Sequence, residues 1–262
     1  GSEMCIRDRN KAIVRLPSKE VSNGLRSVDY GDPSYELVKA EHDVYVKALV
    51  SEGVDVEILA PLPGFPDALF VEDPALVFSE AAVVLKSSRI ERSGEGEILS
   101  RSLENNFHDV FYLDDGFVDG GDILQLPDAT IIGLSQRTDR KGAEALRIIL
   151  NHLGKRSLIC KVPSEVLHLK SDCSLIDCDT ILVTEKLADE KTLSGFNKII
   201  VPEKESNAAN TIRIKSKIFI GEQFPATIQV LEKSGFELIP LGISEISKID
   251  AGLSCMSLRW SQ

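Results

Sequence analysis

The chain has 262 residues, 43% of them hydrophobic and 27% charged, which is the composition of a globular protein long enough to bury a substantial core. Its formal net charge of −11 argues against a nucleic-acid partner, because no basic stripe is present to neutralise phosphates. The same charge is compatible with a cationic small molecule, although surplus carboxylates also serve solubility.

The cysteine pattern favours reduced thiols. The five cysteines are Cys5, Cys160, Cys173, Cys178 and Cys255. Their number is odd and their spacing irregular, and no CxxC pair occurs, so neither a disulfide framework nor a zinc site is predicted. A cytoplasmic location is therefore expected. No membrane partner is expected either, because no apolar run has the length of a transmembrane helix and no apolar signal core stands at the beginning.

Residues 1–9 are set apart from the rest. The run Glu3-Met4-Cys5-Ile6-Arg7-Asp8 resembles a translated sequencing adapter, so residues 1–9 are expected to be a non-native, tag-like segment without chemistry. Residues 10–262 contain no linker or low-complexity stretch, which predicts one domain.

Taken in chain order, the first half predicts strands and helices in alternation. The expected elements are a strand at 11–15, a helix at 33–52, strands at 54–59, within 67–74 and at 75–86, a helix at 95–107, strands at 110–113, 123–124 and 129–134, and a helix at 141–153. In the second half they are strands at 157–162, 166–169, 173–176 and 180–183, a short helix at 187–195, strands at 199–201, 211–214 and 217–220, a helix at 224–234, and strands at 237–240 and 253–258.

Five predicted helices, each accompanied by two or three short strands, divide the chain into units of roughly 50 residues, a length typical of structural repeats. A doubly wound parallel sheet is the alternative, but it alternates single strands with helices and opens with a Gly-rich phosphate loop, and this chain has no GxGxxG. A ring of five ββαβ units would instead bring many strand ends around one central pocket.

Cys255 is the candidate nucleophile. Gly252 allows a sharp turn before Ser254 and Cys255, and the alternating Met256, Leu258 and Trp260 then predict a short buried strand. The thiol would lie at the start of that strand, at the rim of a sheet. A cysteine among apolar residues is also commonly a small core residue, so this pattern alone leaves both interpretations open.

His168 and Asp119 are the candidate base and its orienting partner. His168 lies in the alternating run Val166-Leu167-His168-Leu169-Lys170, where a buried, hydrogen-bonded histidine is the alternative. Asp119 precedes two glycines, where a carboxylate also caps turns. A thiolate needs a base, and the base needs an orienting group, so the three residues together would form a thiol hydrolase.

Three carboxylates surround a short apolar run at residues 67–73. Alternation along a strand would place Asp67 and Asp73 on one side and Glu72 on the other, unless a bulge intervenes. Carboxylates beside buried backbone suit a guanidinium or ammonium ligand. Arg92 and Arg137 could bind a carboxylate at the other end of such a ligand, although each alone could be a surface arginine.

A set of motifs in a fixed order resembles the dimethylargininase (dimethylarginine dimethylaminohydrolase) family. The motifs are Phe65-Pro66-Asp67, Phe70-Val71-Glu72-Asp73-Pro74, Asp119-Gly120-Gly121-Asp122, Gly133-Leu134-Ser135-Gln136-Arg137-Thr138, Leu167-His168-Leu169-Lys170 and Gly252-Leu253-Ser254-Cys255-Met256-Ser257. They extend over nearly the whole chain. The resemblance implies the pentein fold, a five-bladed α/β propeller of guanidine-modifying enzymes, and it implies no cofactor and no metal.

The resemblance also implies roles for particular residues. Cys255 would be the nucleophile, His168 the general acid and base, and Asp119 the residue that orients His168. Substrate binding would fall to Leu25, Asp67, Glu72, Asp73, Arg92, Arg137, Ile249 and Asp250: Asp73 and Glu72 for the guanidinium, the two arginines for the carboxylate, Asp67 and the Leu25 backbone for the amino group, and the backbone at 249 and 250 to close the pocket. Ala251 departs from the family, which often has a second glycine there.

The activity implied is hydrolysis of N-omega-methylated arginine to citrulline and an alkylamine through a covalent thiouronium on Cys255. The expected partner is a cationic guanidino amino acid, and a homodimer is compatible with the resemblance. An arginine deiminase or another guanidino-compound hydrolase is the first alternative. A non-catalytic pentein that binds a partner protein is the remote one, and the Cys255, His168 and Asp119 set speaks against it.

Overall fold

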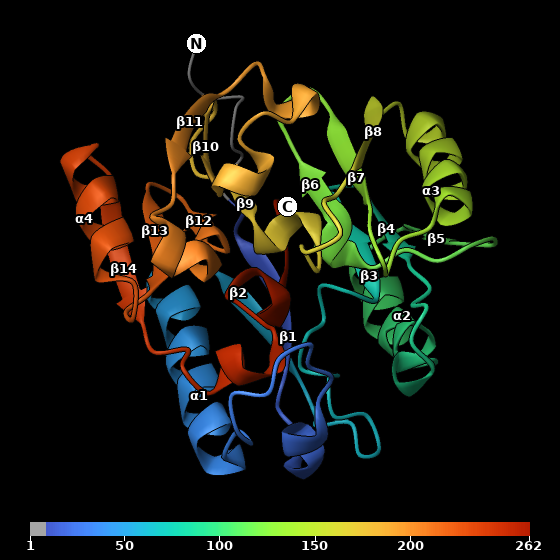
Figure 1. Ribbon diagram of the computed structural model, residues 1–262. Coiled ribbons are helices and arrows are strands. Elements are labelled where there is room, and N and C mark those ends of the chain that lie inside the picture. The colour runs from blue at the N-terminus through green and yellow to red at the C-terminus, as the bar shows by residue number, and fades with distance from the viewer. Residues whose placement is uncertain (1–8) are drawn as a thin grey trace.

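The computed structural model describes residues 9–262. The expectation that residues 1–9 are tag-like therefore concerns a segment that, apart from Arg9, lies outside the described residues. Within residues 9–262 the chain folds into five three-stranded sheets arranged around a common centre, as Figure 1 shows. The predicted five-bladed α/β propeller is confirmed.

The first half contains β1 (Lys11–Arg15), α1 (Tyr35–Ser51), β2 (Asp55–Leu59), β3 (Ala75–Val77), β4 (Ala81–Val84), α2 (Glu95–Asn106), β5 (Asp109–Tyr112), β6 (Ile123–Gln125), β7 (Thr130–Leu134) and α3 (Arg140–His152). The second half contains β8 (Ser157–Lys161), β9 (Cys173–Leu175), β10 (Thr180–Val183), β11 (Asn197–Ile200), β12 (Ile212–Ile214), β13 (Lys217–Gly221), α4 (Pro225–Lys233), β14 (Glu237–Leu241) and β15 (Leu258–Trp260).

Each sheet repeats one pattern, in which an antiparallel pair is followed by a parallel strand. In the second unit, for example, β3 and β4 pair antiparallel, and α2 then carries the chain over to β5, which pairs parallel to β4. A parallel return requires a crossover segment, and in four of the five sheets a helix supplies it on the outside of the ring (Figure 1). The inner strand ends therefore meet at the centre.

The ring is closed by pairing the two ends of the described chain. β15 pairs antiparallel with β1, with Lys11 opposite Trp260 and Ile13 opposite Leu258, and β1 pairs parallel with β2. This closure fixes the segment immediately before β15, which contains Cys255, against the first unit. A break in this pairing is expected to release the candidate nucleophile as well as the strand.

The helix α3 shows how local sequence places an element. Asp139 caps its N-terminus by accepting a hydrogen bond from the Gly142 backbone at 2.6 Å. Ala143, Leu146 and Leu150 recur at helical spacing and are fully buried against the sheet. Burial of each leucine stabilises the fold by about 1.5–3 kcal/mol. The spacing of these apolar residues is the pattern that predicts the helix from the sequence.

Several expected elements are wrong. The described residues contain four α-helices rather than five, because the crossover expected at 187–195 consists of two 3-10 turns, Glu185–Leu187 and Lys191–Leu193. No strand forms at 166–169 or within 67–74, where the chain makes turns. The strand expected at 253–258 is divided into a 3-10 turn, Ser254–Met256, and the later strand β15. Cys255 therefore lies on a tight turn rather than at the start of a strand.

No helix within residues 9–262 is long and apolar enough to cross a membrane.

Candidate active site

Cys255 is held at the centre of the ring by the turn Ser254–Met256. Asn210 supports this turn: its Oδ1 accepts from the Ser254 backbone at 2.9 Å, and its Nδ2 donates to Ser254 Oγ at 3.2 Å and to the Lys170 carbonyl at 3.1 Å. Gly252 is required for this approach, because a Cβ there would lie 2.5 Å from Asn210 Cγ. Asn210 thus connects the turn of Cys255 with the segment that carries His168.

A small pocket brings together residues from all parts of the sequence. Its lining consists of Leu25, Asp67, Phe70, Asp73, Arg92, Arg137, Leu167, His168, Ile249, Asp250, Ala251 and Cys255. Nine of the eleven predicted site residues are in this set; Glu72 and Asp119 are not. The free space is about 30 Å³, which accommodates water-sized groups only.

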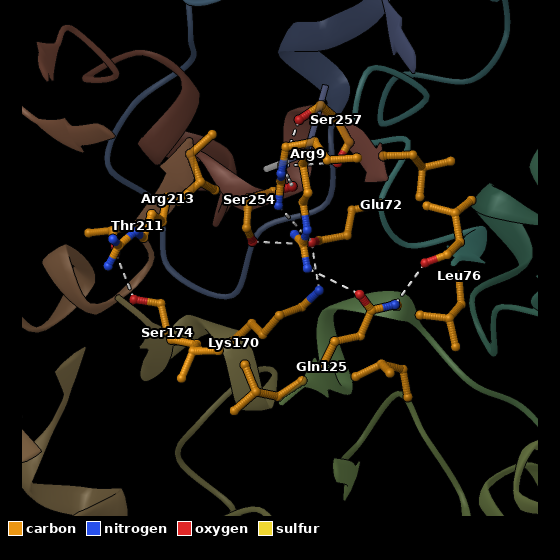
Figure 2. A pocket seen from close by; sticks show the side chains of 18 of the residues that line it. Arg9, Glu72, Leu76, Gln125, Lys170, Ser174, Thr211, Arg213, Ser254 and Ser257 are labelled. Atoms are coloured by element: carbon orange, nitrogen blue, oxygen red, sulfur yellow. Dashed lines mark hydrogen bonds and ion pairs between the residues drawn. The ribbon is translucent and has the colours of Figure 1, made fainter. Parts of the chain in front are cut away.

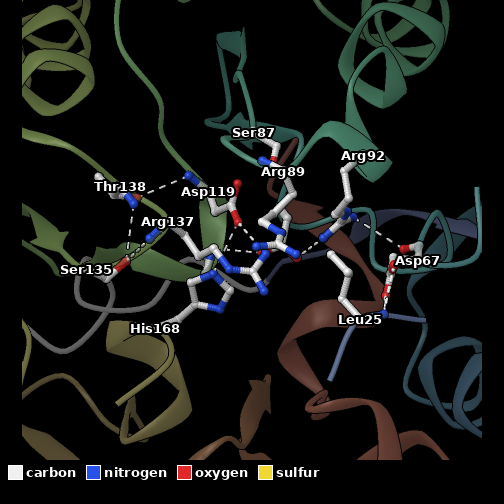
Figure 3. Close-up of polar contacts among 12 residues, drawn as sticks. Leu25, Asp67, Ser87, Arg89, Arg92, Asp119, Ser135, Arg137, Thr138 and His168 are labelled. Atoms are coloured by element: carbon white, nitrogen blue, oxygen red, sulfur yellow. Dashed lines mark hydrogen bonds and ion pairs between the residues drawn. The ribbon is translucent and has the colours of Figure 1, made fainter. Parts of the chain in front are cut away.

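The imidazole of His168 lies against Asp119. Nε2 of His168 is 3.3 Å from Oδ2 of the fully buried Asp119, and Figure 3 shows the two side chains beside Arg137. Burial alone would lower the pKa of His168, but the carboxylates of Asp122, Asp119 and Asp73 raise it to about 9. The imidazole is therefore protonated at neutral pH. Gly121 leaves room for it, since a Cβ at that position would be 2.8 Å from the ring.

The surroundings of the Cys255 thiol favour its neutral form, whereas those of His168 favour the charged form. Burial, together with the carboxylates of Glu72 and Asp73, raises its pKa to about 12. The Gly252 backbone N–H, 3.5 Å from Sγ, and the charge of Lys170 work in the other direction but do not compensate. The resting cysteine is consequently a neutral thiol.

Asp73 is fixed as a carboxylate at the pocket wall. Its Oδ1 accepts from the Gly121 backbone at 3.1 Å, and its Oδ2 accepts from Arg92 Nη1. Burial would raise the pKa of Asp73, but Arg92 and His168 hold it below its usual value. Each carboxylate oxygen has a second lone pair, so the group can still accept hydrogen bonds from a guanidinium.

Arg92 is buried and its donors are used within the protein. Nε and Nη2 bind Glu95, with the shortest contact at 2.6 Å, and Nη2 also donates to the Phe70 carbonyl at 3.0 Å. Arg92 therefore holds the turn that carries Asp67 and Asp73. Arg137, by contrast, has only a 3.8 Å contact between Nη1 and Asp119 among the described ion pairs, so its guanidinium is better placed to receive a ligand.

Asp67 holds the segment at the mouth of the pocket. Its two carboxylate oxygens accept from the Leu25 backbone at 3.1 and 3.2 Å, and burial raises its pKa (Figure 3). On the other side, Asp250 accepts from the Ser27 backbone, and its left-handed backbone, with φ of 55°, is uncommon for a residue other than glycine. The predicted positions 25, 67, 249 and 250 thus form one rim.

The structure places Glu72 away from this pocket. Oε1 of Glu72 accepts from Lys170 at 2.6 Å, and Oε2 accepts from Ser254 Oγ at 2.7 Å, on the rear side of the backbone. The expected alternation is thus half right: Asp73 faces the pocket and Glu72 the opposite side, but on a turn instead of a strand. Asp119 lies behind His168 rather than in the lining, as an orienting residue would.

Asp122 is a supporting residue to which sequence reasoning gave no role. Its Oδ2 accepts from Ser135 Oγ at 2.6 Å and Thr138 Oγ1 at 2.7 Å, and its Oδ1 accepts from the Leu169 backbone at 3.0 Å. One buried carboxylate therefore fixes both the turn of Arg137 and the segment next to His168. Its place at the end of the Asp119-Gly120-Gly121-Asp122 motif was the available signal.

The side chains of Asp73, Asp119 and His168 offer ligand atoms within 4.8 Å of one another. A metal would need His168 as a neutral ligand, whereas its surroundings favour the imidazolium, and Arg92 already engages Asp73. The cluster fits the stabilisation of a proton or an organic cation better than a metal ion.

A five-unit ring with a thiol, an imidazole and carboxylates at its centre defines a pentein of the guanidine-modifying class. The arginine deiminase family profile matches residues 65–223. The N(G),N(G)-dimethylarginine dimethylaminohydrolase of Pseudomonas aeruginosa is 33% identical over 250 residues, which cover 95% of this chain and 98% of that protein. A relative of the same name from Streptomyces coelicolor is 31% identical, with 95% and 96% covered. The chain therefore belongs to the arginine deiminase family and, within it, to the dimethylarginine dimethylaminohydrolases.

Solved structures support the same family assignment. The P. aeruginosa enzyme, as a cysteine-to-serine mutant complexed with citrulline, superposes with a TM-score of 0.92 at 32% identity over 96% of this chain and 99% of that one. An adduct of a dimethylarginine dimethylaminohydrolase with S-methyl-L-thiocitrulline gives a TM-score of 0.93 at 32% identity, again with 96% and 99% covered. The N-terminal domain of a cyanobacterial arginine dihydrolase shares the fold, with a TM-score of 0.84 at 20% identity.

Proposed function

We propose that the protein hydrolyses N-omega-methylated arginine to citrulline and dimethylamine or methylamine. The observation that carries the proposal is the convergence of Cys255, His168 and Asp73 on one pocket whose rim holds Asp67 and Arg137. This arrangement has a nucleophile, an acid and an anionic acceptor in the middle, and groups for an amino acid's two charges at the edge. The names of the relatives point to the same reaction.

In the first half of the reaction, the sulfur of Cys255 attacks the guanidinium carbon. The carbon is a poor electrophile because resonance spreads its charge, so a thiolate suits it better than a hydroxyl. The bound cation lowers the pKa of the thiol, and the thiol proton leaves to solvent, since His168 already carries its own. The imidazolium then protonates the departing alkylamine as the carbon–nitrogen bond breaks.

In the second half, the neutral imidazole of His168 removes a proton from water. The resulting hydroxide attacks the S-alkylthiouronium carbon, the carbon–sulfur bond breaks, and citrulline leaves with the regenerated thiol. Asp119 keeps the ring oriented in both steps and stabilises the imidazolium.

Substrate binding follows from the same geometry. Asp73 accepts from the guanidinium, Arg137 binds the α-carboxylate, and Asp67 with the Leu25 backbone binds the amino group. Arg92, with its donors engaged by Glu95 and Asp73, supports the wall and reaches the substrate carboxylate only if those contacts change. Glu72 supports the site from the rear through Lys170 and Ser254. Such chemistry needs a reduced thiol, which favours the cytoplasm.

The test is citrulline formation from asymmetric dimethylarginine, monomethylarginine, arginine and agmatine. We expect turnover of the methylated compounds over arginine, and a loss of about a thousandfold or more in both Cys255→Ser and His168→Ala. Preference for arginine would make the protein a deiminase, an alternative that the match to the arginine deiminase profile supports. Folded protein without turnover of any compound would contradict the proposal and favour a binding protein.

A further inference from the structure

A second cavity lies directly behind the active site. It has a volume of about 100 Å³, and Glu72, Lys170 and Ser254 line it, whereas their neighbours Asp73 and Cys255 line the active-site pocket. The two spaces are separated by one layer of backbone, in which the Glu72 backbone donates to the Cys255 carbonyl at 3.2 Å. The volume is enough for several waters or for one small ion with its hydration.

The lining of this rear cavity carries more positive than negative side chains. Arg9, Lys170, Arg213 and Arg259 contribute four cations, and Glu72 is the one carboxylate among the lining residues (Figure 2). Arg213 has its own partner, since Nη1 is 2.9 Å from Asp177. Glu72 is therefore shared between Lys170 at 2.6 Å and Arg259 at 3.8 Å.

Arg259 is a buried cation of which, within the described part of the chain, only one nitrogen is hydrogen-bonded. Its side chain is 6% exposed, Nη1 donates to Ser257 Oγ at 2.6 Å and to the carbonyls of Ser257 and Ser254 at 3.1 and 3.4 Å, and Nε has no hydrogen-bond partner among residues 9–262. Nη2 lies 3.8 Å from Glu72, beyond hydrogen-bond distance. A buried guanidinium with unused donors is costly unless an anion or water completes it.

The charge of Arg9 adds to the excess of positive side chains in the rear cavity. Its guanidinium donates to Gln125 Oε1 at 3.1 Å, and burial together with the nearby Arg259 lowers its pKa to about 10. Arg9 belongs to the segment expected to be non-native, but the excess does not depend on it, because Lys170 and Arg259 still outnumber Glu72.

We propose that the rear cavity binds a small monovalent inorganic anion between Lys170 and Arg259. The anion would accept from the Lys170 ammonium and from Arg259 Nη2, which lies 3.8 Å from Glu72. An uncompensated charge of one or two favours a monovalent ion. The site is distinct from the substrate pocket, so it does not depend on the proposed activity.

Bromide is the probe that tests the proposal. Thermal unfolding of the full chain is followed while sodium bromide replaces sodium gluconate at constant ionic strength. We expect a saturable rise of the melting temperature with one site, and an anomalous bromide peak next to Arg259 in crystals grown with bromide.

Two variants should move the affinity in opposite directions. Glu72→Gln removes the competing carboxylate and should tighten bromide binding, and Arg259→Gln should weaken it, each by at least about tenfold because a unit charge about 4 Å away interacts by several times RT even at an effective dielectric constant of about 20. Lys170→Met should also weaken bromide binding, and it replaces Arg259→Gln as the test variant if Arg259→Gln does not fold.

Arg140→Gln, at an arginine that is 70% exposed, is the matched control and should leave the affinity unchanged. A response that is linear in bromide, or equal in Glu72→Gln and the control, would overturn the proposal.

Discussion

The raised pKa of His168 makes the stability of the protein depend on pH in a defined window. The pKa rises from the model-peptide value of 6.5 to about 9 on folding. A group whose pKa is raised in the folded state stabilises it fully below the unfolded value and loses that contribution as pH increases toward the folded value. At 1.36 kcal/mol per pKa unit the full contribution is about 3 kcal/mol, of which about 2 kcal/mol is lost between pH 6 and pH 8.

Another perturbed histidine acts within this window in the opposite direction. His42, whose pKa burial lowers from 6.5 to about 4, destabilises the fold by about 1 kcal/mol at pH 6, and this cost is nearly gone by pH 8. The pKa of Cys255 is raised to about 12, so its effect begins only where unfolded thiols ionise, above about pH 8.5. The difference between wild type and a His168 variant over pH 6 to 8 therefore isolates His168, because both proteins share the contribution of His42.

The assay is urea unfolding at pH 6, 7 and 8, followed by the fluorescence of Trp260, the chain's single tryptophan, which is buried in the closing strand β15. Wild type should lose about 1 kcal/mol of unfolding free energy across the interval, because His42 offsets part of the loss at His168, whereas His168→Gln should gain about 1 kcal/mol. His108→Gln, at a histidine that is 96% exposed, is the control and should keep the wild-type slope. A wild-type slope that persists in His168→Gln, or an imidazole NMR titration with its midpoint near 6.5, would refute the assignment of the charge cluster.

Three further predictions concern single contacts. Gly121→Ala should fold but lose most of its kcat for dimethylarginine, because the new Cβ would be 2.8 Å from the His168 ring, whereas Gly195→Ala, with nothing within 4 Å, should match wild type in the same assay. Asp122→Asn should lower the unfolding free energy by about 2 kcal/mol, since buried donors lose their acceptor, and calorimetry that finds no loss would contradict its supporting role. Alkylation of Cys255 by iodoacetamide should become faster at pH 8 when acetamidinium is present; identical pH curves with and without that cation would argue against thiolate formation driven by the substrate.

The strands and outer helices could be predicted from the sequence because local patterns determine them. β7, β13 and α3 are apolar runs that pack against their own unit, and their predicted bounds lie within two residues of those observed. The crossover at 187–195 failed as a helix prediction because two short 3-10 turns bury the same apolar side chains, Leu187 and Leu193.

The turns of the site could not be predicted in the same way, because distant partners hold them. Residues 67–73 alternate like a strand, yet Arg92 binds the carbonyls of Asp67 and Phe70 from 25 and 22 positions away and holds them in a turn. Nine of the site residues implied by the resemblance lie in one pocket, although the resemblance uses no knowledge of these contacts. It gave no role to Asn210 or Asp122, because their roles depend on partners at least 13 positions away in the sequence.

The two central turns, at residues 72–73 and 254–255, each place side chains in both the substrate pocket and the rear cavity. Successive residues on a tight segment project to opposite sides, so Asp73 and Cys255 face the substrate pocket while Glu72 and Ser254 face the rear cavity. Charges in the rear cavity act on the thiol through the backbone layer between the two spaces. Glu72 raises the pKa of Cys255 and Lys170 lowers it, although neither lines the pocket of the thiol. A variant in the rear cavity should therefore change the reactivity of Cys255 without touching the substrate. Glu72→Gln removes a charge that opposes the thiolate, so it should speed alkylation of the free protein at a fixed pH. A rate equal to that of wild type in a folded variant would show that the backbone layer screens the two sides from each other.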